Sequence, residues 1–223
     1  MSKHLERDLD LLRKSLLEVG TKVEAAAQTS IRALSERRAD LAEAVIGRDN
    51  EIDRMEVLLE EECLKVLALH QPVASDLRFV IGVMKVNNDL ERMGDQAVNI
   101  AERAIFLAER EPLGFPPDFH RMMDAVQKMV SSALDAHVNL DTGLARSVGR
   151  MDDEVDDIHR AMFDTLQQRM QEDPATVERA VAYLSASKEL ERIADLATNI
   201  AEDAVFMVEG EVVRHRGSEQ PDI

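Results

Sequence analysis

Apolar residues recur every three or four positions through most of the chain, which is the spacing of helices that bury one face. Leu9, Leu12 and Leu16, for example, share one side of the first stretch, with charged residues between them. Six stretches of this kind predict six helices, over residues 5–35, 41–69, 75–110, 118–148, 152–171 and 175–209. The pattern therefore predicts an all-α fold.

Prolines divide these helices into two groups. Pro72 lacks an N–H group and restricts the residue before it, so the second helix should end there. Segment 111–117, with the sequence EPLGFPP, holds three of the six prolines and is the clearest boundary in the chain. We predict a first unit over residues 1–111, a linker over 112–117, a second unit over 118–209 and a flexible tail over 210–223.

The two units carry the same motifs in the same order. Segment 90–102, LERMGDQAVNIAE, matches segment 190–202, LERIADLATNIAE, at nine of thirteen positions and a constant offset of 100. A shorter match, DNEID at 49–53 with DDEVD at 152–156, has an offset of 103. Internal duplication of a three-helix unit explains both matches. We therefore expect two pseudo-symmetric three-helix bundles packed side by side.

Composition narrows the function without assigning one. Aromatic residues make up only 3% of the chain and tryptophan is absent, which favours helices over sheets. Lys plus Arg number 27 against 44 Asp plus Glu, so the net charge of −17 opposes binding to nucleic acid. No uncharged run approaches the roughly 18 residues that cross a bilayer, so we expect a cytoplasmic protein. The single cysteine, Cys63, rules out an internal disulfide and a thiolate zinc cluster.

Each long motif places its oxygen-bearing side chains on one stripe of its helix. At about 100° per residue, four such side chains fall within about 80° of one another. In the first motif they are Glu91, Asp95, Asn99 and Glu102, and in the second Glu191, Asp195, Asn199 and Glu202. Apolar residues fill much of the remaining circumference, so each acidic stripe should adjoin the packed surface.

The shorter motifs add a pair of acids one helical turn apart. The pairs are Asp49 with Asp53 and Asp152 with Asp156. Like charges at this spacing repel by a few tenths of a kcal/mol, and facing pairs on adjacent helices repel more unless a cation or proton neutralises them. Because the arrangement occurs in both copies, it indicates a cation site.

Carboxylate and amide oxygens suit Mg²⁺, Ca²⁺, Mn²⁺ or iron better than structural zinc. The identity of the metal stays open among iron, manganese, magnesium, calcium and zinc. A simpler interpretation is that Arg92 and Arg192 pair with these acids on a solvated surface. His159 follows Asp156 by three residues, as in di-iron enzymes, but its counterpart is Glu56, so we interpret it as a lone surface histidine.

The two LER motifs, the paired acids, LRFVIGVMKV before the first motif and VEGEVVRH after the second together resemble the PhoU family over nearly the whole chain. The resemblance implies two three-helix bundles, multinuclear metal sites and a homodimer. Carried over by position, the metal ligands would be Asp49, Asp53, Glu91, Asp95, Asn99 and Glu102 in the first copy, and Asp152, Asp156, Glu191, Asp195, Asn199 and Glu202 in the second. At one motif position the first copy has Gly94 and the second has Ala194.

The resemblance also implies a signalling role. Such proteins link the phosphate ABC transporter, through its ATPase, to a membrane sensor histidine kinase and restrain phosphate-starvation genes, so any membrane association would be indirect. The sequence has no glycine-rich phosphate loop and no activated nucleophile, so we expect no enzyme. Two alternatives stay open: a di-iron or di-manganese carboxylate oxidase, and a metal-free helical adaptor.

Overall fold

A computed structural model describes residues 3–113 and 118–210, and within those ranges the chain is helical without a strand. The all-α prediction is therefore confirmed. The elements are α1 (Lys3–Glu36), α2 (Ala39–Ile46), α3 (Asp49–His70), α4 (Ala74–Ala108), α5 (Phe119–Asn139), α6 (Thr142–Glu172), the short 3₁₀ helix η1 (Pro174–Thr176) and α7 (Val177–Glu209).

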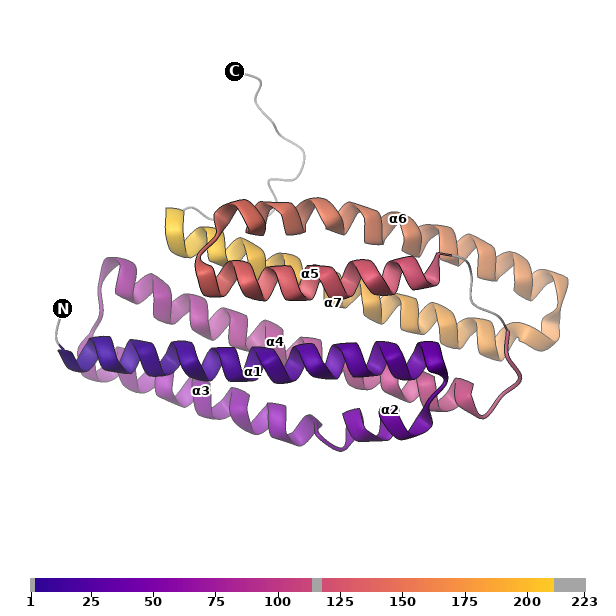
Figure 1. The fold of residues 1–223 in the computed structure, drawn as a ribbon, viewed down its shortest axis with the longest axis horizontal. Helices are drawn as coiled ribbons and strands as arrows, with labels where there is room; N and C mark the ends of the chain where they lie inside the picture. The colour runs from indigo at the N-terminus through magenta and orange to yellow at the C-terminus, as the bar shows by residue number, and fades with distance from the viewer. Residues whose placement is uncertain (1–2, 114–117, 211–223) are drawn as a thin grey trace, which may run out of the picture.

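The helices form two elongated bundles that lie side by side (Figure 1). Helices α1 to α4 make the first bundle, and α5 to α7 make the second. Helix α4 packs against α7, and α1 packs against α5, so the two motif helices meet at the centre of the molecule. Their apolar faces explain this position, because Leu90 and Met93 on α4 and Leu190 and Ile193 on α7 are fully buried.

The predicted single helix over residues 41–69 is interrupted, and that prediction was wrong. Helix α2 ends at Ile46 and α3 begins at Asp49. The Gly47 N–H donates to the Glu43 carbonyl at 2.9 Å, and the Arg48 N–H donates to the Val45 carbonyl at 3.1 Å. The second bond spans three residues, which tightens the final turn, and glycine's poor helix propensity favours ending the helix here.

The predicted break between residues 148 and 152 was also wrong, because α6 runs unbroken through this segment. The chain instead turns at Leu140, whose φ of 54° is left-handed, and Asp141 begins the next helix. The Asp141 carboxylate accepts a hydrogen bond from the Leu144 N–H at 2.9 Å, which caps α6. Gly149 therefore lies inside α6 and does not end a helix, since the N-cap of α6 is eight residues earlier.

The linker and tail predictions fall partly outside the described residues. Positions 114–117 of the predicted linker and 211–223 of the predicted tail are not described, and the division into two units stays a prediction. Leu113, before the first gap, is buried. No described helix is long and apolar enough to span a membrane.

Candidate functional site

Packing of the motif helices decides where the acidic stripes lie. Ala97, Ile100 and Ala104 of α4 are fully buried, and the corresponding alanines and isoleucine of α7 are too. These faces hold the stripes beside the neighbouring helices, because α3 packs against α4 and α6 packs against α7. The short acid motifs begin α3 and occupy the middle of α6, so each copy brings its two motifs together.

The first copy gathers four of its six predicted ligands into one cluster. They are Asp49, Asp53, Glu91 and Asp95. Burial is the main cause of the raised pKa of Asp49, and the charges of Asp53 and Asp95 raise it further. None of the four forms an ion pair with a lysine or arginine in the described part of the chain. The cluster therefore holds several negative charges without a protein cation.

Glu56 belongs to the same cluster, although it is not among the predicted ligands. Burial, then the charges of Glu60 and Asp53, raise the pKa of Glu56, and its own charge raises that of Glu91. The side-chain amide of Asn87 fixes this turn by donating to the Glu56 carbonyl at 2.9 Å. The available signal was its position three residues after Asp53 on the same helix face.

The second copy forms an equivalent cluster from Asp152, Asp156, Glu191 and Asp195. Burial, followed by the charges of Asp195 and Asp156, raises the pKa of Asp152 to about 6. This cluster differs from the first in having a cation: the Lys188 ammonium lies 2.6 Å from a Glu191 carboxylate oxygen. The second site is therefore partly neutralised by the protein itself.

His159 occupies the position that Glu56 holds in the first copy. Its Nδ1 lies 2.6 Å from the Ser187 hydroxyl, a hydrogen bond between α6 and α7. Burial lowers the pKa of His159, the charges of Glu191 and Asp156 act against this, and the result favours the neutral ring. The contact ties the histidine into the fold beside the acids.

The remaining predicted ligands lie further along the motif helices. Glu102 pairs with Arg103 at 3.2 Å, and the Asn99 amide donates to Gln96 at 3.5 Å. Asn199 and Glu202 line the same cavity as Asp152 and Asp195. In the second copy, Asn199 and Glu202 therefore share one space with Asp152 and Asp195, whereas the contacts described for Asn99 and Glu102 are with residues outside the first cluster.

The two motif arginines do not neutralise the predicted ligands. Arg92 lies 3.7 Å from Asp89, and Arg192 donates to Glu189 at 2.9 Å. Both partners precede their arginine by one turn and lie outside the predicted set. The simpler interpretation, in which these arginines pair with the motif acids, is therefore wrong.

The donor set fits a hard cation, because each cluster offers several carboxylates whose charges oppose one another. Within residues 3–113 and 118–210, no three carboxylate, histidine or cysteine side chains are arranged so that they could hold a metal ion. Binding would therefore require the carboxylates to rotate toward a common point. The four-acid clusters are the groups that would do so.

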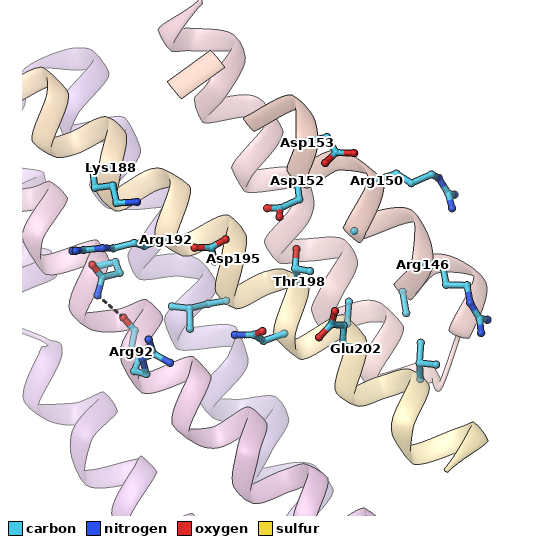
Figure 2. Close-up of a pocket in the computed structure, with 17 residues that line it drawn as sticks. Arg92, Arg146, Arg150, Asp152, Asp153, Lys188, Arg192, Asp195, Thr198 and Glu202 are labelled. Atoms are coloured by element: carbon cyan, nitrogen blue, oxygen red, sulfur yellow. Dashed lines mark hydrogen bonds between the residues drawn. The ribbon is translucent and has the colours of Figure 1, made fainter. Parts of the chain in front are cut away.

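A cavity of about 1340 Å³ opens between α4, α6 and α7 beside the second cluster. Figure 2 shows Asp152 and Asp195 pointing toward each other across it, with Thr198 and Glu202 further along α7. Basic side chains flank this acidic centre: Arg92, Lys188 and Arg192 on one side and Arg146 and Arg150 on the other.

The comparisons with known proteins agree with this duplicated architecture. The family model described as the PhoU domain matches twice, over residues 16–104 and 119–204. The chain belongs to the PhoU family. The phosphate-specific transport system accessory protein PhoU homolog of Aquifex aeolicus is 39% identical over 212 residues, covering 95% of this chain and 96% of the relative.

Solved PhoU structures have the same fold. The crystal structure of PhoU from Pseudomonas aeruginosa superposes with a TM-score of 0.90 at 39% identity, covering 92% of this chain and 99% of that one. The phosphate transport system regulatory protein PhoU from Streptococcus pneumoniae gives a TM-score of 0.87 at 31% identity, covering 94% and 99%. PhoU proteins are named as accessory or regulatory proteins, so this member of the family is a regulator and not an enzyme.

Proposed function

We propose that this protein regulates phosphate uptake as a metal-binding adaptor between the phosphate ABC transporter and a sensor histidine kinase. The relatives named above are accessory and regulatory proteins of phosphate transport systems, and the match to them covers nearly the whole chain. In this role the protein restrains phosphate-starvation genes when phosphate is plentiful. It works in the cytoplasm as a homodimer, and it meets the membrane only through its partners.

The observation that carries the metal-binding part is the duplicated carboxylate cluster. In both copies, burial and neighbouring acids raise the pKa of an aspartate, Asp49 in the first and Asp152 in the second. Because each of the two clusters holds carboxylates that repel one another, a cation that binds there stabilises the folded protein. Asp49, Asp53, Glu91 and Asp95 would hold metal in the first copy, and Asp152, Asp156, Glu191 and Asp195 in the second.

The metal has a regulatory rather than a catalytic use in this proposal. Each cluster lies where two helices of one bundle meet, and α4 and α7 also form the contact between the bundles. A cation that draws the carboxylates together would change how these helices pack. The docking surface for the transporter ATPase or the kinase would then depend on metal occupancy.

A metal-free helical adaptor is the competing proposal, and two observations favour it. Lys188 already neutralises Glu191 in the second cluster, and no three ligands are arranged for metal in the described residues. Elemental analysis of untagged protein purified without chelator separates the two proposals. Protein that is free of metal would support the adaptor without a metal.

The regulatory role is tested by deleting the gene and measuring a phosphate-starvation reporter in phosphate-rich medium. We expect the deletion strain to express the reporter constitutively. In that strain, a variant with both Asp95→Ala and Asp195→Ala should reach normal abundance but repress the reporter only weakly, because one acid is lost from each cluster. Asp124→Ala combined with Asp164→Ala is the matched control, since both residues are exposed and neither belongs to a cluster.

The outcomes discriminate between the parts of the proposal. Normal repression in the deletion strain would discard the regulatory role of this chain. Full repression by a folded, metal-free Asp95→Ala and Asp195→Ala protein would show that signalling depends on the docking surface alone. Deregulation by the control pair as well would assign the effect to general surface charge.

A further inference from the structure

The cavity beside the second cluster is unusual in this acidic protein because basic side chains surround it. Arg92 from α4 and Arg192 from α7 both line it, although they occupy equivalent positions in the two copies. Their side chains are 58% and 50% exposed, and each also contacts an acid one turn earlier, Asp89 or Glu189. In a chain with a net charge of −17, this lining brings five basic side chains together with four acids, Asp152, Asp153, Asp195 and Glu202.

The duplication supplies an internal reference for this cavity. At the offset of 100 that relates α4 to α7, Lys188 and Thr198 replace Asn88 and Val98 of the first copy. The second copy has therefore gained an ammonium and a hydroxyl group at positions that line the cavity. Neither group exists at the equivalent position of the first copy.

The α6 side of the cavity also carries more positive charge than its counterpart in the first copy. The offset of 103 aligns α2 with the start of α6, and buried Ala42 then matches buried Ala145. At this offset Arg146 and Arg150 replace Glu43 and Gly47, and both line the cavity.

Two changes in this segment of α6 have the opposite sign. Asp153 stands where the first copy has Asn50, which adds an acid, and Met151 stands where it has Arg48, which removes a cation. The balance of the replacements still makes the second copy the more cationic one.

Thr198 supplies an independent sign of a ligand. Its Oγ1 atom is buried and has no hydrogen-bond partner among the described residues. A buried hydroxyl without a partner costs free energy, which a ligand oxygen would recover. Figure 2 places Thr198 between the facing acids Asp152 and Asp195 on one side and Glu202 on the other.

We propose that this cavity binds a phosphate group, held by Arg92, Lys188 and Arg192 with the Thr198 hydroxyl, when a cation occupies the second carboxylate cluster. The inference rests on the proposed function, because Asp152 and Asp195 would repel an anion unless a cation neutralised them. Arginine suits phosphate because its planar fork donates two parallel hydrogen bonds to an oxyanion. Lysine and threonine add a point charge and a neutral donor.

Lys188 couples the two binding events. Its ammonium now contacts Glu191, which is one of the acids that would hold the cation. A cation that takes the Glu191 carboxylate releases the ammonium of Lys188, whose side chain is 44% exposed, so that the ammonium can turn toward an anion. Metal and phosphate should therefore each strengthen binding of the other.

Equilibrium dialysis with radiolabelled orthophosphate tests the inference on full-length protein loaded with Mn²⁺ and on the same protein in EDTA. We expect binding with Mn²⁺ and little in EDTA. Lys188→Asn combined with Thr198→Val restores the first-copy residues and should weaken phosphate binding about tenfold or more, since a charge-assisted contact is lost. Arg121→Gln is the control, because Arg121 is exposed, pairs with Glu154 and lies outside the cavity.

Unlabelled ATP in competition separates free phosphate from a phosphate carried by a larger molecule. Displacement by ATP at lower concentration than by orthophosphate identifies the larger molecule, and the reverse order identifies free phosphate. Either order supports a phosphate site, provided that the double variant weakens it. Arg192→Gln, at an exposed position, repeats the test if the double variant does not fold.

Three results would overturn the inference. If metal-loaded protein binds no phosphate, the phosphate site is rejected and the proposed function is unaffected. Equal phosphate binding by the parent, Lys188→Asn with Thr198→Val, and Arg192→Gln shows that the cavity is not the site. Elemental analysis before dialysis identifies protein that takes up no Mn²⁺, and that result rejects the metal-binding part of the proposed function together with this inference.

Discussion

The ammonium of Lys85 lies 3.2 Å from a carboxylate oxygen of Asp203, and this ion pair joins α4 of the first bundle to α7 of the second. Asp203 is only 2% exposed. The Lys85 ammonium also lies 4.7 Å from the ring centre of Phe206, a cation–π contact on α7. Because a buried carboxylate needs a counter-charge, the pair favours one arrangement of the two bundles.

Lys85→Met should lower the free energy of unfolding by about 3 kcal/mol, because it removes the cation beside a buried carboxylate. Adding Asp203→Leu should recover most of that loss, since an apolar pair needs no counter-charge. Urea denaturation followed by circular dichroism measures both variants. A single variant as stable as the parent would show that the ion pair contributes nothing to holding the bundles.

Gly94→Ala should raise the free energy of unfolding by about 0.5–1 kcal/mol, the gain expected inside a helix. The added Cβ would lie 3.5 Å from Ile52 and 3.9 Å from the Asp49 carboxylate, which are ordinary contacts, and Ala194 already occupies the equivalent position. Gly82→Ala on the same helix is the control. Its Cβ would lie 2.8 Å from the Met207 sulfur, so it should not stabilise.

His137 should make the fold sensitive to mild acid. Burial, and then the charge of Arg13, lowers the pKa of His137 to about 4, and its Nδ1 has no hydrogen-bond partner among the described residues. The unfolded chain therefore binds a proton that the folded chain refuses between about pH 6.5 and 4, so stability falls as the pH falls through that window. The loss between pH 7 and 5 is about 2 kcal/mol.

The measurement compares His137→Leu with the parent by urea denaturation at pH 7 and pH 5. Buried carboxylates with raised pKa values, such as Asp152, act in the opposite direction in both proteins, so only the difference between the proteins reports on His137. The variant should lose about 2 kcal/mol less than the parent over this interval. Equal losses would mean that His137 is protonated in the folded state.

Metal removal should destabilise the parent, because a cation that binds only the folded state adds about 2.7 kcal/mol at a hundredfold excess over its Kd. Asp95→Asn combined with Asp195→Asn should reverse the order of stability. With Mn²⁺ the variant should melt below the parent, and in EDTA it should melt at or above it, because two repelling charges are gone. Thermal melts in both buffers check this, and a parent unaffected by EDTA contradicts it.

The sequence alone determined the helical class and the acid stripes, since both follow from local periodicity. Spacing of 3.6 residues per turn places Glu91 and Asp95 on one face whatever the helix packs against. Duplication was readable for the same reason, because the motifs repeat at fixed offsets. Helix ends were less predictable: a glycine interrupts the helix at Gly47 but not at Gly149, where α6 continues.

Tertiary structure decided which groups meet. Glu56 joins the first cluster because α3 packs on α4, a contact that periodicity does not contain. The cavity beside Asp152 likewise exists only because α4, α6 and α7 leave space between them. Local sequence fixes the face on which a side chain lies, whereas its neighbours and its electrostatic surroundings depend on residues far away in the chain.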